Sequence, residues 1–253
     1  MTFARKRRLA AHIFTVAALV AWAAYSASIP SYQVPGPVAV ARSATVFVTD
    51  RFAFAHLAYS LAHVASAIIG AFVLGSALAL LAHYAPVFRL LVHGRIAPFL
   101  NSFSGIGWTL LAVLWFGVND VTVVFAITAV LLPFSIVNMR EGLDSLDPEL
   151  LEMGQSFGRS RWRNFRKIVL PALAPFIFAS LRVSFGVAWK VTLTAELFGG
   201  SAGLGYLVNV AREEFDTPLI FAAIGLIVLF VHLTDRHFLT PLQAHVVRRY
   251  RTA

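Results

Sequence analysis

The chain has 253 residues, of which 58% are hydrophobic and only 13% are charged, too few charges to cover the surface of a soluble protein of this size. Its mean hydropathy of +0.75 predicts that lipid solvates much of its apolar surface. The net charge of +9 does not indicate a nucleic-acid partner, because the basic residues lie between apolar runs and not along one helix face. The absence of cysteine excludes disulfides, thiolate metal sites and cysteine nucleophiles.

The N-terminal segment places four basic residues, Arg5 to Arg8, before a run without charge from Leu9 to Ile29. A secretory signal has an apolar region of about 7–15 residues, which is shorter than this run. The length favours an uncleaved first membrane span. Cleavage near Ala27 is the alternative.

Six apolar segments approach the roughly 20 residues that a helix needs to cross the hydrocarbon of a bilayer. We expect an all-α polytopic bundle of about six spans forming a single transmembrane domain over residues 1–253, with no internal repeat. The expected spans are Leu9–Ile29, His56–Ala82, Ile96–Val118, Val121–Met139, Ile168–Lys190 and Pro218–Leu239.

The distribution of Lys and Arg predicts the orientation, because basic loops stay in the cytoplasm. With the N-terminus inside, sixteen of the 21 basic residues fall on the inner side. Only Arg42, Arg51 and Arg212 fall outside, and Arg182 and Lys190 lie within the fifth span. Both termini of this multi-pass membrane protein are therefore expected in the cytoplasm.

Small residues recur in the second and third spans, where they allow helices to approach closely. We expect them to serve helix packing. They are Ser66, Gly70, Gly75, Ser76, Gly105 and Gly107.

The longest inner loop, residues 140–167, has the chemistry of a short amphipathic helix. Asp147 suits the N-cap, Pro148 the first helical position and Glu149 the positive end of the helix dipole. Gly158 can end the helix in a left-handed conformation. Two interpretations remain open: a solvated connector followed by an interfacial helix, or a docking helix for a cytoplasmic partner.

The segment from Asp147 to Pro171 resembles the signature loop of the membrane-spanning permeases of ATP-binding-cassette (ABC) importers. The resemblance rests on Glu152-Met153-Gly154, then Gly158, then Ile168-Val169-Leu170-Pro171, with Met153 and Gly154 standing where the family motif has alanines. The longer run is similar to the branch that imports nitrate, sulfonates, taurine, thiamine precursors or aromatic acids.

The resemblance implies a multi-pass protein of the bacterial inner membrane, in which Asp147 to Gly158 is a coupling helix seated in a groove of an ATPase subunit. It implies a second permease copy, two cytoplasmic ATPases that use ATP and Mg²⁺, and an external substrate-binding protein; the chain itself would bind no cofactor. The expected coupling residues are Asp147, Glu149, Glu152, Met153, Gly154, Gly158, Leu170 and Pro171.

Two cations in the fifth span are candidates for the translocation path. Arg182 and Lys190 are eight residues apart, so they lie on roughly one helix face, and we expect them to point into the bundle. They either stabilise packing, by pairing with backbone carbonyls or Glu196, or form a positive lining for an anionic substrate.

The glycine-rich stretch Gly199 to Gly205 could form an outer gate, but it is not a nucleotide loop. No strand precedes it, and no Gly-Lys-Ser/Thr sequence occurs in the chain. We therefore expect no ATPase activity in this chain. His56 and His63 could share a face, but without a matching pair elsewhere we expect histidines satisfied inside the bundle or at the membrane interface, and no metal or haem site.

Three functions are compatible with a helical membrane protein. The motifs favour a permease subunit. An independent secondary transporter of a small anion is the alternative, although no inverted repeat is visible. A membrane enzyme or cytochrome would need convergent carboxylates or histidine pairs, and the twelve acidic residues lie mostly in loops.

Overall fold

The computed structural model describes residues 3–147, 149 and 161–243, and every regular element in these residues is helical, as predicted. The elements are α1 (Phe3–Ala27), α2 (Pro37–Thr49), α3 (Arg51–Tyr84), α4 (Pro86–Leu91), η1 (Val92–Ile96), α5 (Ala97–Ser102), α6 (Gly105–Phe116), α7 (Asp120–Asp144), α9 (Arg161–Asn164), η2 (Phe165–Val169), α10 (Leu170–Gly199), α11 (Leu204–Glu213), α12 (Thr217–Thr234) and η3 (Asp235–Leu239). The three η segments are single π-helical turns inside longer helices.

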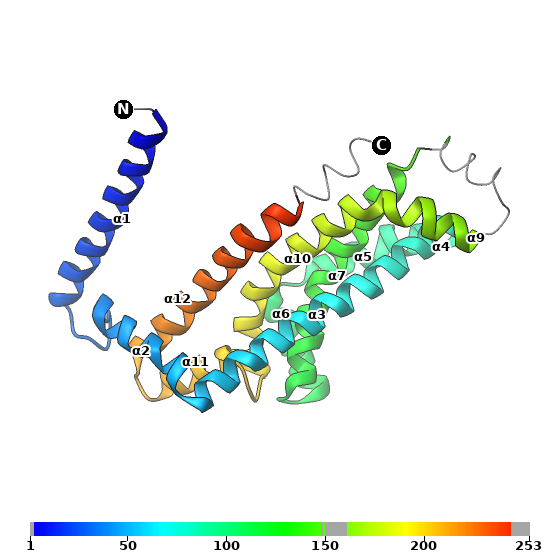
Figure 1. Ribbon diagram of the computed structural model, residues 1–253. Coiled ribbons are helices and arrows are strands. Elements are labelled where there is room, and N and C mark those ends of the chain that lie inside the picture. Colours follow the sequence, from blue (N-terminus) through cyan, green and yellow to red (C-terminus); the bar gives the residue numbers. More distant parts are fainter. Residues whose placement is uncertain (1–2, 148, 150–160, 244–253) are drawn as a thin grey trace.

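Three long helices, α3, α7 and α10, contact one another and form the centre of the bundle. Figure 1 shows the start of α1, the helices α4 and α9 and the end of α12 at one end of the molecule, and α2 and α11 at the other. We call these the α4–α9 end and the α2–α11 end. The helix α1 stands apart from the bundle.

The contact between α3 and α7 depends on small side chains. Ala67 and Ala71 of α3 are fully buried, and a methyl group added to Gly75 would lie 2.5 Å from the Cβ of Ser135 on α7. No real Cβ comes so close to its neighbour, so glycine is what allows the two helices to touch here.

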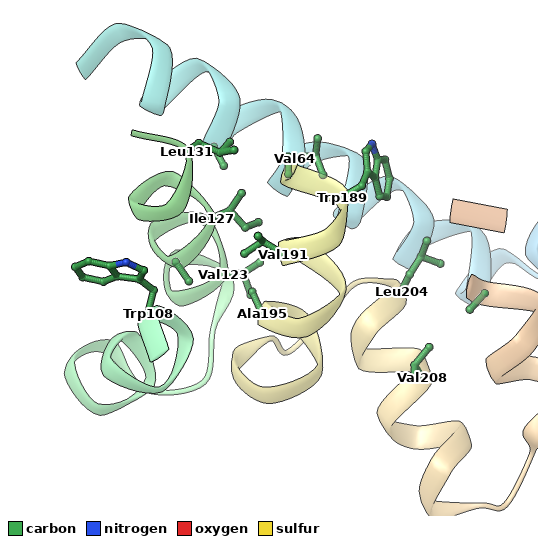
Figure 2. Close-up of a cluster of buried hydrophobic side chains, with 14 of the residues drawn as sticks. Val64, Trp108, Val123, Ile127, Leu131, Trp189, Val191, Ala195, Leu204 and Val208 are labelled. Atoms are coloured by element: carbon green, nitrogen blue, oxygen red, sulfur yellow. The ribbon is translucent and has the colours of Figure 1, made fainter. Parts of the chain in front are cut away.

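Branched apolar side chains fill the space between α7 and α10. Val123, Ile127 and Leu131 of α7 are fully buried, and Figure 2 shows Val123 and Ile127 at the level of Val191 and Ala195 of α10, while Leu131 lies beside α3. The spacing of four residues along α7 gives one continuous apolar stripe, which is the pattern of a buried helix face.

Four helices in the described residues are long and apolar enough to cross a membrane, and one bent pair of helices would make a fifth. The four are Arg51–Tyr84, Asp120–Asp144, Trp162–Gly199 and Thr217–Gln243. The expected first span coincides with α1. The apolar part of this helix, Ile13–Ala27, has fewer than the roughly 20 residues that a full crossing needs. Six spans therefore remains a prediction.

The expected third span, Ile96–Val118, is wrong as one straight helix. The chain breaks after Ser102, and the segments Pro86–Ser102 and Gly105–Phe116 meet at an angle of 89°. Ser104 explains the break, because its hydroxyl accepts a hydrogen bond from the Gly107 backbone N–H at 3.2 Å and caps a new helix. Apolar length alone does not reveal such a cap.

The expected fifth span ends too early at Lys190, because α10 continues to Gly199. The last nine residues include Glu196, whose charge argues against a span when only the sequence is read. The helices α2 and α11 were not predicted. Both lie at the α2–α11 end, where α2 contacts α3 and α12 while α11 contacts α3, α10 and α12.

Candidate functional site

A buried carboxylate is the centre of the best-defined polar site in the described chain. Glu196 lies in the last turn of α10, and its side chain is 0% exposed. Its Oε2 accepts hydrogen bonds from the Ser60 hydroxyl and the Gly205 backbone N–H, both at 2.8 Å, and its Oε1 lies 2.9 Å from Nδ1 of His63. An ionised carboxylate only accepts, so Nδ1 of His63 then carries the hydrogen. Three partners offset the cost of burying the charge.

The polar residues of α3 that face this site follow helical spacing. His56, Ser60 and His63 are separated by four and three positions, so they lie on one face, and all three are buried. His56 Nδ1 accepts a hydrogen bond from the Gly203 backbone N–H at 3.0 Å, and Ser60 Oγ accepts one from the Leu204 N–H at 2.7 Å.

Three consecutive backbone N–H groups, those of Gly203, Leu204 and Gly205, are thus each bonded by a side chain of α3 or α10. They belong to the start of α11, where N–H groups have no partner within the helix and where the helix dipole favours negative charge. The side chains of Glu196, Ser60 and His56, which belong to other helices, together cap the N-terminus of α11. We call Glu196, His56, Ser60, His63 and the start of α11 the Glu196 cluster.

Glycines make the close approach of this loop to Glu196 possible. Gly203 has a φ of +112°, and a Cβ there would lie 2.2 Å from the carboxyl carbon of Glu196. A Cβ on Gly205 would lie 2.4 Å from the carbonyl oxygen of Leu193 and 2.6 Å from Cβ of Glu196. The glycine-rich stretch therefore serves to pack the loop on the end of α10.

His63 also connects the cluster to α7. Its Nε2 lies 3.4 Å from Oδ1 of Asp120, whose side chain is half exposed, while Glu196 is fully buried. Nε2 makes no hydrogen bond with the described residues, and its contact with Asp120 is an ion pair only when the imidazole is protonated. The imidazole therefore bridges a surface carboxylate and a buried one, and it links α3, α7 and α10 at the α2–α11 end.

His56 and His63 are buried inside the bundle and Nδ1 of each has a hydrogen-bond partner, whereas Nε2 of His63 has none among the described residues. The part of the chain that the structure describes contains no group of three or more His, Asp or Glu side chains arranged to hold a metal ion. The sequence did not predict that the face of α3 that carries His56, Ser60 and His63 packs against Glu196 of α10. Their spacing was visible in the sequence, but their partner on α10 was not.

Arg182 and Lys190 are not brought together with Glu196. Arg182 pairs with Asp235 through two parallel bonds of 3.0 and 3.1 Å, and its guanidinium also donates to Gln243 and Thr240. Arg182 and Glu196 are fourteen positions apart, about 21 Å along the helix axis. Lys190 is exposed on the surface of the single chain, so the expectation that both cations point into the bundle is wrong for Lys190 within one subunit.

The ends of the predicted coupling segment are visible in the structure. Asp147 Oδ1 accepts a hydrogen bond from the Glu149 backbone N–H at 2.9 Å, the contact expected of a capping carboxylate. Leu170 and Pro171 are the first residues of α10. The remaining predicted coupling residues, Glu152, Met153, Gly154 and Gly158, lie outside the described residues.

The segment leading into α10 is firmly packed. Val169, directly before Leu170, is 3% exposed and belongs to a buried cluster with Leu173, Met139 and Leu143 of α7, and Ala79 of α3. The start of α10 is therefore held against both of its neighbours at the α4–α9 end.

Comparison with known proteins agrees with this architecture. Residues 13–252 match the model of a family described as the binding-protein-dependent transport system inner membrane component. SsuC of Bacillus subtilis (strain 168), a permease named for aliphatic sulfonates transport, is 27% identical over 201 residues, covering 79% of this chain and 72% of the relative. The taurine transport system permease protein TauC of Escherichia coli (strain K12) is 26% identical over 189 residues, covering 74% and 67%.

Solved structures show the same fold. The inward-facing MetNI methionine ABC transporter has a chain that matches with a TM-score of 0.66 at 15% identity, covering 79% of this chain and 96% of that one. An amino acid ABC transporter with histidines matches with a TM-score of 0.60 at 15% identity, covering 84% and 97%. The chain belongs to the family of binding-protein-dependent transport system inner membrane components, the multi-pass permease subunits of ABC importers.

Proposed function

We propose that this permease subunit forms the translocation path for a small anionic solute of the sulfonate or taurine type, delivered by an external binding protein. The observation that carries the substrate class is the likeness to SsuC and TauC, whose names refer to aliphatic sulfonates and taurine. An exposed cation on a central helix, Lys190 of α10, supports a path for a negatively charged group.

The working unit is two copies of this permease with two ATPase subunits that bind ATP and Mg²⁺. The family description, in which transport depends on a binding protein, supports such an assembly. Much apolar surface also remains on the single chain: in the most apolar window of Thr217–Gln243 only 11% is buried, and in that of Trp162–Gly199 only 22%. This surface is available to lipid and to a second copy.

Residues Asp147 to Gly158 act as the coupling helix, and the buried contacts of Val169 and Leu173 support this role. A segment that enters α10 through such a packed cluster can pass a rigid-body displacement to the whole helix. At the other end of α10, the Glu196 cluster fixes α11 and residues 200–203 to the same helix. A movement that begins at the ATPase therefore reaches the α2–α11 end through one continuous element.

Reconstitution tests the proposal. The permease, its ATPase and its binding protein are placed in proteoliposomes, and uptake of taurine and of an alkanesulfonate is compared with that of a neutral amide of equal size. We expect uptake that requires ATP, the binding protein and the sulfonate group. Uptake driven by an ion gradient without ATP would support the secondary transporter instead, and ATP-dependent uptake of the neutral compound alone would reject the anionic class.

A further inference from the structure

A basic cavity lies at the α4–α9 end, far from the Glu196 cluster. Its volume is about 170 Å³, whereas about 10–15 Å³ is enough to hold one water molecule. The end of α3, the segment from α4 to η1 and the end of α7 enclose it. The lining residues are Ala79, Ala82, His83, Pro86, Arg89, His93, Arg140, Leu143 and Asp144.

The charges around this cavity favour an anion. Arg140 Nε donates to Asp144 at 3.3 Å, so the one acidic residue among the described lining residues is already paired with one of the two arginines. Within the described residues, Arg89 and the imidazoles of His83 and His93 make no hydrogen bond to another side chain, so they can meet a ligand together with the guanidinium nitrogens of Arg140 that do not bond Asp144. Such a set of donors suits the oxygens of a phosphate group.

An apolar surface begins directly beside the cavity. On α4, Val87 and Leu90 directly follow the lining residues Pro86 and Arg89 in the sequence and are 86% and 72% exposed, and Tyr84, at the end of α3, is 63% exposed. A water-soluble anion would need only the basic side chains of the cavity to bind. A phospholipid needs both features together, because its phosphate lies next to its acyl chains.

We propose that this cavity binds the phosphodiester headgroup of an anionic phospholipid, with the acyl chains lying along Val87 and Leu90. Basic pockets between helices on the cytoplasmic side of a membrane recognise acidic lipids in this way. The site belongs to the inner leaflet in the orientation that the basic loops predict. Binding of a lipid there would hold α4 against the ends of α3 and α7, beside the start of α10.

Lipid retention by the purified permease tests this site without ATP, binding protein or substrate, so its outcome is independent of the proposed function. The protein is exchanged into nanodiscs containing phosphatidylglycerol and phosphatidylcholine, extracted in mild detergent, and examined by native mass spectrometry for bound lipid. Arg89→Gln removes the unpaired arginine, Arg89→Lys keeps the charge, and Arg42→Gln on exposed α2 is the matched control.

We expect the wild type to retain phosphatidylglycerol in preference to phosphatidylcholine. Retention should fall about fivefold in Arg89→Gln, as the loss of one basic contact at a membrane surface predicts, and stay close to wild type in Arg89→Lys and Arg42→Gln. Unchanged phosphatidylglycerol retention in Arg89→Gln would overturn the proposal.

Three other outcomes would also reject it. Displacement of the ligand by inorganic phosphate, with no preference between the two lipids, would assign the cavity to a free anion. Loss of ATPase co-purification in Arg89→Gln with lipid retention intact would assign it to a protein contact. A lower thermal midpoint with lipid retention intact would show that Arg89 only complements the carbonyl ends of α3 and α7.

Discussion

The carboxylate of Glu196 lies 2.9 Å from Nδ1 of His63, although 133 positions separate the two residues in the chain. This contact joins the end of α10 to the first half of α3, and the 3.4 Å approach of His63 to Asp120 adds the start of α7. The three central helices are thus tied at the α2–α11 end by one imidazole and two carboxylates. At the α4–α9 end an apolar cluster ties the same helices.

Replacing Glu196 with Gln should destabilise the permease by about 1–3 kcal/mol, the range for leaving buried polar groups without partners. The amide keeps the shape of the side chain, and its oxygen can accept from Ser60 and Gly205 as Oε2 does, but its NH2 group then faces Nδ1–H of His63, which loses its acceptor. The thermal midpoint of the detergent-purified protein, measured by size-exclusion chromatography after heating, should fall.

Glu214→Gln is the matched control for this change. Glu214 is exposed just after α11, and we expect its replacement to leave the midpoint unchanged. If Glu196→Gln behaves like Glu214→Gln, the buried carboxylate does not stabilise the α2–α11 end.

Gly205→Ala should destabilise the contact between α11 and α10 by about 1–3 kcal/mol through overpacking. The added methyl would meet the carbonyl oxygen of Leu193 and the Cβ of Glu196, both well inside normal contact distance. Gly186→Ala, on the same α10, adds a methyl with nothing within 4 Å and should be neutral or slightly stabilising. Equal midpoints for the two variants would contradict the close packing of the glycine loop.

Two glycines of α3 give a second matched pair. A methyl on Gly75 would lie 2.5 Å from Cβ of Ser135, whereas one on Gly70 would lie at an ordinary 3.5 Å from Oγ1 of Thr128. We expect Gly75→Ala to lower the yield of folded protein and its thermal midpoint, and Gly70→Ala to have little effect. A larger loss in Gly70→Ala would show that α3 and α7 approach each other elsewhere.

The long apolar helices were predictable because membrane thickness sets a length that the sequence displays directly. The helices α3 and α7 contain the expected second and fourth spans, whereas the expected fifth span runs from η2 into α10 and the sixth from α12 through η3. The break before Gly105 was not predictable from hydropathy, because it depends on one hydroxyl, that of Ser104, competing for a backbone N–H.

The Glu196 cluster was only half visible in the sequence. His56, Ser60 and His63 have the spacing of one helix face, but the sequence does not say what that face meets. In the sequence alone, Glu196 has the character of a loop residue, because its burial depends on the packing of α11 against α10. Contacts between residues more than 130 positions apart are fixed by helix packing, which single-sequence patterns do not encode.

Gly158→Val should abolish ATP-driven uptake while the protein still inserts in the membrane and co-purifies with its ATPase. The reason is the proposed role of Gly158 in ending the coupling helix, since a β-branched residue is strongly disfavoured in a left-handed backbone conformation. Uptake and ATP hydrolysis are measured in the same proteoliposomes. Undiminished uptake would reject the coupling role of residues 147–158.

Replacing each of the two cations of α10 with Gln should have different effects on stability and on transport. Arg182 is held by Asp235, with side chains 32% and 42% exposed, so Arg182→Gln should cost roughly 0–1 kcal/mol of stability, and Asp235→Asn should cost little more in that background. Lys190 is exposed on the single chain, so Lys190→Gln should leave the thermal midpoint unchanged.

Transport then decides which cation lines the path. Removing a charge that meets the anion in transit should raise the concentration of sulfonate needed for half-maximal uptake, whereas removing a charge that only holds α10 to the chain after α12 should not. We expect the first result for Lys190→Gln and the second for Arg182→Gln. The reverse pattern would place Arg182 in the path and make its bond to Asp235 a contact that opens during transport.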